Sequence, residues 1–121
     1  MTKDTKDFKI RQFSCNHCEA NHVTQVLIDK IQEIKDTIDM NVYIISAYRC
    51  KLHNKNLGGR KGYNQGLIAD IKVTDKDDKQ VSAKEVVDII DDYGIMNDYG
   101  IGEGEGIITI DLSVGYERWE R

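Results

Sequence analysis

The sequence predicts a single α+β domain in which helices pack on a small, mainly antiparallel sheet. Two stretches carry apolar residues at helical spacing, and short β-branched stretches alternate with turns rich in glycine and aspartate. The elements follow the order strand, helix, strand, loop, strand, helix, strand, and no linker or repeat divides the 121 residues. We therefore expect one domain over residues 8–121, preceded by a flexible arm, residues 1–7.

The first half of the chain contains the most regular helical pattern. Residues 8–13 (FKIRQF) alternate apolar and polar side chains, which predicts a short strand. Asn21 is a suitable N-cap for a helix whose apolar residues recur every three or four positions from Val23 to Ile38. Residues 42–45 (VYII) are typical of a buried strand.

The second half begins with a glycine-rich segment, residues 50–66, predicted to be a loop or a short helix followed by a loop. A strand over 67–73 follows, and a capping box at Ser82-Ala-Lys-Glu85 opens a helix whose apolar face ends at Tyr93. Residues 107–112 predict a last strand. Tyr116 and Trp119 are expected to cover the core, with ligand stacking as the alternative.

Composition excludes several classes of partner and location. The net charge of −4 and pI of about 5.3 argue against a nucleic-acid binder. No apolar run approaches a membrane span, and the N-terminal residues lack the apolar segment of a secretory signal, so we expect a cytoplasmic protein without membrane contact. Three cysteines, an odd number, argue against a disulfide framework.

Three polar segments are unusual for a core. Arg49 follows a predicted buried strand and precedes His53-Asn54 and Gly58-Gly59, an arrangement suited to presenting a guanidinium to a carboxylate. Asp70 stands among aliphatic residues of a strand, where a charge must be paired, hydrogen-bonded or bound to metal. Thr109 and Asp111 share one face of the last strand. The alternatives are a structural ion pair for Arg49 and an ordinary solvent face for Thr109 and Asp111.

These three segments, in this order, resemble the zinc D-alanyl-D-alanine carboxypeptidase and L-alanyl-D-glutamate endopeptidase family, which cleaves peptidoglycan and includes many phage endolysins. The family pattern reads approximately S-G-Y-R-x-x-x-H-N-x-x-x-G-G, then S-x-H-x-x-G-x-A-x-D-I, then G-I-G…H-x-D. The matching segments here are Ser46-Ala-Tyr48-Arg49 with His53-Asn54 and Gly58-Gly59, Gly66-Leu-Ile-Ala69-Asp70-Ile71, Gly100-Ile-Gly102, and Thr109-Ile-Asp111. The resemblance implies a Hedgehog/D,D-peptidase-like fold and a phage or mobile-element origin.

The departures from this pattern concern the metal. The family binds zinc through His, Asp and His, but Tyr63 stands where the first histidine belongs and Thr109 where the second belongs. Only Asp70 is retained, and residues 54–121 contain no histidine that a shift in alignment could supply. One carboxylate with two hydroxyls is a poor ligand set for a hydrolytic zinc ion. We therefore expect no cofactor at the family site and no catalytic residues there.

The cysteines offer a separate metal hypothesis. Cys15, Cys18 and His22 have C-x-x-C-x-x-x-H spacing, and Cys50 or His53 could complete a four-ligand zinc site across the fold. The alternative is that these cysteines are ordinary buried side chains.

Three hypotheses of function follow. The preferred one is a catalytically inactive relative, a pseudoenzyme, that binds a cell-wall stem peptide or a protein partner through the former active-site cleft. The second is an active peptidoglycan peptidase with a non-standard metal site that uses Asp70 as ligand and Asp111 or Glu105 as base. The third is a zinc-stapled interaction domain. The partner-binding residues expected for the first hypothesis are Arg49, His53, Tyr63, Asp70, Thr109 and Asp111.

Overall fold

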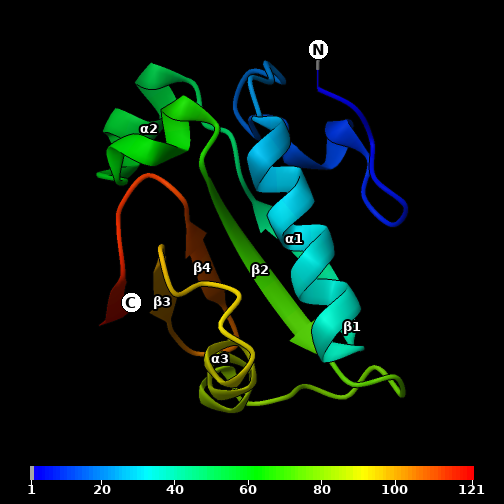
Figure 1. Ribbon diagram of the computed structural model, residues 1–121. Helices are drawn as coiled ribbons and strands as arrows, with labels where there is room; N and C mark the ends of the chain where they lie inside the picture. The colour runs from blue at the N-terminus through cyan, green and yellow to red at the C-terminus, as the bar shows by residue number, and fades with distance from the viewer. Residues whose placement is uncertain (1) are drawn as a thin grey trace.

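A five-stranded sheet forms the centre of the computed structural model, which describes residues 2–121 (Figure 1). The strands lie in the order β1-β2-β4-β3-β5, and every neighbouring pair is antiparallel except β3 and β5, which are parallel. Their bounds are β1 Asn41–Ser46, β2 Ile68–Thr74, β3 Gly100–Glu103, β4 Ile108–Asp111 and β5 Glu117–Glu120. The predicted α+β class with a mainly antiparallel sheet is confirmed.

Helix α1 packs on the sheet, whereas helix α2 belongs to the connection between two of its strands. Helix α1 (Gln25–Ile38) lies across β1 and β2, and α3 (Ala83–Asp92) lies beside it (Figure 1). Helix α2 (Lys51–Leu57) and the short 3-10 helix η2 (Lys61–Gln65) follow β1 and lead into β2. None of the described helices is long and apolar enough to cross a bilayer.

The hydrophobic core lies between the sheet and helices α1 and α3. The face of α1 that the spacing predicts is fully buried, and alternation along β2 and β4 turns their aliphatic side chains toward it. The core members from these four elements include Leu27, Ile28, Ile31, Ile34, Ala69, Ile71, Val73, Val86, Ile90, Ile108 and Ile110. Because side chains alternate, Asp70 and Thr109 face the opposite side of the sheet.

The predicted strand over residues 8–13 is wrong, because residues Ile10–Phe13 form a 3-10 helix, η1. Local side chains satisfy its first amides: Gln12 Oε1 accepts from Lys9 N at 2.6 Å, and Asp4 Oδ1 accepts from Ile10 N at 2.7 Å. These local bonds compete with strand pairing. Phe8 and Phe13 are both buried.

Other differences concern element ends and the C-terminal strands. Thr24, not Asn21, caps α1, and its hydroxyl accepts from Leu27 N at 3.3 Å. Tyr93 was expected on the buried face of α3 but is 68% exposed, because the helix ends at Asp92. The strands β3 and β5 were not predicted, since two of the four residues of β3 are glycine and three of the four residues of β5 are charged.

The N-terminal residues contact the first helix and the segment just before it. Thr2 Oγ1 donates to Val23 O at 3.0 Å, and Thr5 Oγ1 donates to Gln32 Oε1 at 2.8 Å. Residues 2–7 therefore run along α1.

Candidate functional site

Asp70 is the centre of a buried polar cluster on the face of the sheet opposite α1. It is 3% exposed, and its Oδ1 accepts two short hydrogen bonds, from Tyr63 Oη and from Thr109 Oγ1, each at 2.7 Å. The register of β2 and β4 places Thr109 directly opposite Asp70. Tyr63 reaches the same oxygen from η2. The two residues at the histidine positions of the family pattern thus hydrogen-bond the carboxylate that the family uses as a ligand.

The second carboxylate oxygen faces two guanidinium groups. Arg49 Nη2 lies 3.5 Å and Arg121 Nη2 lies 3.8 Å from Asp70 Oδ2. Both distances exceed the roughly 2.7–2.9 Å of a strong charge-assisted hydrogen bond, so neither guanidinium is saturated by Asp70.

The position of Arg49 is fixed from several directions. Its guanidinium lies 3.7 Å from the centre of the Tyr63 ring, and its amide donates to Tyr63 O at 3.2 Å. Its Nη1 donates to Asn54 Oδ1 at 3.3 Å, while its Nε is buried without a partner. A Cβ atom at Gly59 would stand 2.4 Å from Arg49 Nη1 and 2.1 Å from Asn54 Oδ1, which explains the second glycine of the Gly58-Gly59 pair.

The environment of Tyr63 keeps its phenol protonated. Burial, followed by the charge of Asp70 and the hydrogen bond to it, raises the pKa of Tyr63 to about 12. The hydroxyl is therefore a permanent donor to Asp70 at physiological pH.

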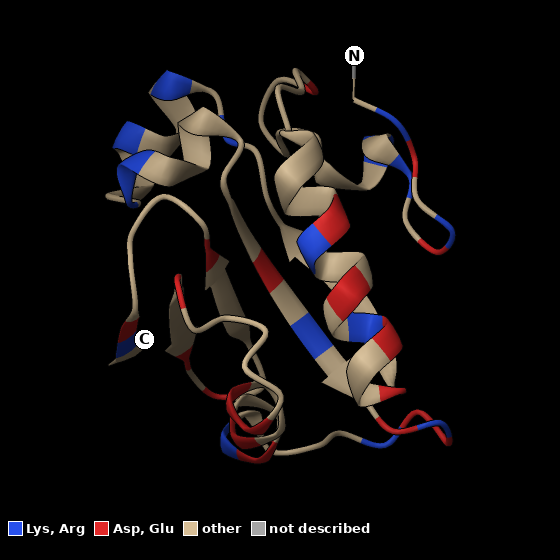
Figure 2. Cartoon of the chain, in the orientation of Figure 1, with Lys and Arg blue, Asp and Glu red and all other residues tan. Residues whose placement is uncertain are grey.

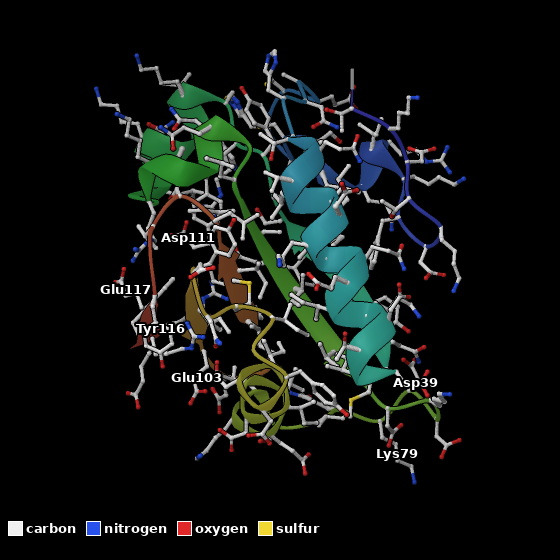
Figure 3. All side chains as sticks on the ribbon, viewed as in Figure 1. Asp39, Lys79, Glu103, Asp111, Tyr116 and Glu117 are labelled. Carbon is white, nitrogen blue, oxygen red and sulfur yellow. The ribbon has the colours of Figure 1, made fainter. Side chains whose placement is uncertain are left out.

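Asp111 forms a separate buried cluster at the end of β4. It is fully buried; its Oδ2 accepts from Arg60 Nε at 2.9 Å, and its Oδ1 accepts from Ser113 N at 2.8 Å. Arg60 also pairs with Glu117 at 3.2 Å, so it bridges Asp111 and the C-terminal segment. Figure 3 labels Asp111 and Glu117. Asp111 is occupied by these contacts and is not free to act as a base.

A groove of about 450 Å³ runs beside these two clusters. Arg49, Tyr63 and Thr109 line it next to Asp70, and Gly58, Gly59, Leu57 and the C-terminal strand complete its walls. Trp119 forms part of the wall, and the guanidinium of Arg60 lies 4.2 Å from its ring centre. Figure 2 shows Lys and Arg on α2, whereas Asp and Glu gather on α3.

The residues at the family's zinc position do not fit a hydrolytic zinc ion. Both oxygens of Asp70 are already in contact with donors: two hydroxyls at one oxygen and two guanidinium groups at the other. Hydroxyl groups are weak zinc ligands, and two positive charges beside the carboxylate oppose a divalent cation.

The three cysteines lie close together in space, although Cys50 is far from Cys15 and Cys18 in the sequence. The sulfurs of Cys15, Cys18 and Cys50 all lie within 4.8 Å of one another. Among the described residues this group does not include His22, which instead packs edge-on against Tyr48 with ring centres 5.2 Å apart.

The neighbour of this cluster is a different histidine, His17. Its Nδ1 lies 3.6 Å from Cys50 Sγ. His53, expected in the cleft, stacks on His17 with ring centres 5.3 Å apart. Burial raises the pKa of the Cys15 thiol, but hydrogen bonds from the amides of Cys50, Cys18 and His17 outweigh it and lower that pKa to about 7.

Sequence reasoning missed three residues of these sites: Arg60, Arg121 and His17. Trp119, for which ligand stacking was the alternative to covering the core, lies in the wall of the groove. Arg60 follows the Gly58-Gly59 pair directly, and His17 stands between Cys15 and Cys18, so proximity to a motif could have indicated both. Arg121 could not be inferred, because the parallel pairing of β5 with β3 brings it to Asp70.

Residues 5–102 match the protein-family model described as Peptidase M15. Neither the curated proteins nor the solved structures give a match.

Proposed function

This chain belongs to the peptidase M15 family, and we propose that it is a non-catalytic member that binds a peptide through the groove beside Asp70. The observation that carries the proposal is the state of Asp70: the carboxylate that should hold zinc is instead buried under two hydroxyl donors and faces two arginines. Without zinc, no bound water is acidified and no scissile carbonyl is polarised.

The same contacts support recognition of a carboxylate. Arg49 and Arg121 both border the groove, and their distances of 3.5 and 3.8 Å from Asp70 leave hydrogen-bonding capacity unused. A guanidinium binds a carboxylate with two parallel hydrogen bonds. The ligand we propose is therefore a peptide with a free carboxylate, such as a cell-wall stem peptide or the C-terminus of a protein.

The aromatic wall of the groove supports a peptide rather than a bare anion. Trp119 presents its ring beside Arg60, and Leu57, which is 57% exposed, adds an apolar edge. Aromatic and arginine side chains dominate the binding energy of peptide and protein interfaces. The phage or mobile-element origin implied by the resemblance is compatible with this role and forms part of the proposal.

Binding can be measured through Trp119, the only tryptophan in the chain. Stem peptides with a free C-terminal carboxylate should change its emission saturably and give heat in calorimetric titration. The same peptides with an amidated C-terminus should bind at least about tenfold more weakly, because a hydrogen bond to a charged group contributes about 1.5–3 kcal/mol. Equal binding of both forms would refute the carboxylate mode.

Two variants of equal charge sharpen the test. Arg121→Gln removes a guanidinium at the groove, whereas Arg11→Gln removes an exposed one in η1. Only the first should weaken binding, again by about tenfold.

The competing function, an active peptidoglycan peptidase, is tested by incubating the protein with purified peptidoglycan and zinc. We expect no released peptides. Peptide release that disappears in Asp70→Asn would overturn the non-catalytic assignment.

A further inference from the structure

We propose that Cys15, Cys18 and Cys50, with His17 as the fourth ligand, form a structural zinc site remote from Asp70. The site joins two segments separated by more than thirty residues, the loop after η1 and the start of α2. It stands apart from the groove: within the described part of the chain, none of these four residues lines the groove.

The three sulfurs and His17 are near the separations that a tetrahedral zinc ion requires. Sulfurs that are each about 2.3 Å from such an ion stand about 3.8 Å apart, and a sulfur and an imidazole nitrogen stand about 3.6 Å apart. The three sulfurs lie within 4.8 Å of one another, and His17 Nδ1 lies 3.6 Å from Cys50 Sγ. His17 is outside the group of ligand atoms that lie within 4.8 Å of one another, so the site requires its exposed ring to leave the stack on His53 and turn toward Cys15 and Cys18.

The backbone around the sulfurs is arranged for thiolates. Cys15 Sγ accepts from His17 N at 3.4 Å and from Cys50 N at 3.3 Å, and Cys50 Sγ accepts from His53 N at 3.4 Å. Amide donors to sulfur stabilise its negative charge, and such outer contacts orient the ligands of metal sites.

The loop that carries two of the ligands is itself tightly folded. Cys15 N donates to Ala20 O at 2.7 Å, and Glu19 N donates to Cys15 O at 2.9 Å, so the loop closes on itself within six residues. Glu19 takes a positive φ of 64°, which a non-glycine residue rarely adopts. This turn brings Cys15 and Cys18 to the same side.

A metal here has a clear structural consequence. Cys50 caps α2 and directly follows Arg49, so the site would fix the segment that places Arg49 over Tyr63. Because this role is structural, it does not depend on the proposed binding function.

The test is metal binding by the full chain under reducing conditions. Purified apoprotein should bind one equivalent of zinc, and cobalt in its place should give thiolate charge-transfer bands and the intense visible bands of a tetrahedral ion. Removal of zinc by a chelator should lower the Tm. No stoichiometric binding, or a cobalt spectrum without thiolate bands, would overturn the proposal.

Matched variants identify the ligands. Cys18→Ser should weaken the charge-transfer bands, since two thiolates remain, and should reduce zinc affinity at least about tenfold, since even groups that only orient a ligand contribute about 10–100-fold. Cys18 is exposed, so the substitution should leave the apoprotein folded. His17→Ala should weaken zinc binding by the same order, while His22→Ala, at the other exposed histidine of the loop, should not. Equal effects of the two histidine variants would refute the assignment of His17.

Discussion

Removing either hydroxyl that donates to Asp70 should destabilise the fold by about 2 kcal/mol. In Thr109→Val and Tyr63→Phe the shape of the side chain is nearly kept, but Oδ1 of a carboxylate that is 3% exposed loses a donor at 2.7 Å. Hydrogen bonds to charged groups contribute about 1.5–3 kcal/mol, and at this burial water cannot replace the lost donor.

The double variant should cost more than the sum of the two single variants. When one hydroxyl is removed, the other still donates to the same oxygen, and only the second removal leaves the oxygen without a short hydrogen bond. Groups in one such network typically show coupling energies of about 0.5–3 kcal/mol. Urea denaturation gives the free energy of unfolding of all four proteins.

The chain contains its own control. Asp78 is exposed, and its Oδ1 accepts from the exposed Tyr43 Oη at 2.8 Å and from the buried Thr74 Oγ1 at 2.9 Å, so the same three residue types surround a carboxylate that water reaches. Tyr43→Phe should change stability by less than about 1 kcal/mol, because water can donate to Asp78 in place of the phenol hydroxyl. If Tyr63→Phe costs no more than Tyr43→Phe, Asp70 is not a buried anion held by hydroxyl donors.

Three further predictions concern the same face of the sheet. The pKa of Tyr63 is raised from 10.0 to about 12, so its contribution to stability is complete below pH 10 and is lost as the pH rises through 12. Tyr63→Phe should therefore remove the last tyrosine step of an ultraviolet titration, and an unchanged titration would contradict this. The double variant Tyr63→His/Thr109→His restores two imidazoles beside Asp70 and should bind one zinc equivalent more than its parent; no additional metal would mean that these two positions are not what excludes zinc. A Cβ at Gly102 would stand 2.5 Å from the Trp119 ring, so Gly102→Ala should shift the emission of Trp119 and cost about 1–3 kcal/mol, whereas unchanged emission and stability would contradict the packing.

The fold class could be predicted from the sequence because the long periodic elements carry it. Residues 23–38 and 67–73 have patterns long enough to specify a helix and a strand, and both are confirmed. The strands β3 and β5 escaped prediction, whereas the equally short β4 did not, because β4 is mostly β-branched, β3 is half glycine and β5 is mostly charged.

The candidate site was only partly predictable for a related reason. Motif spacing indicated that Arg49, Tyr63, Asp70 and Thr109 belong together, and the structure brings these four into contact. Arg121 depends on the pairing of β5, which no local pattern encodes. The sequence pointed to His22 as the histidine beside the cysteines, but the structure places His17 there. Which of the two lies there depends on the path of one loop, which spacing alone does not give.

The most direct test of the central claim compares the zinc content of the wild-type chain with that of Asp70→Asn. Both proteins are reconstituted with zinc, freed of excess metal and analysed together with Cys18→Ser. We predict that Asp70→Asn holds as much zinc as the wild type, because Asp70 is satisfied by hydroxyl and guanidinium donors and holds no metal. Loss of one zinc equivalent in Asp70→Asn would show that Asp70 is a ligand and would contradict the non-catalytic assignment.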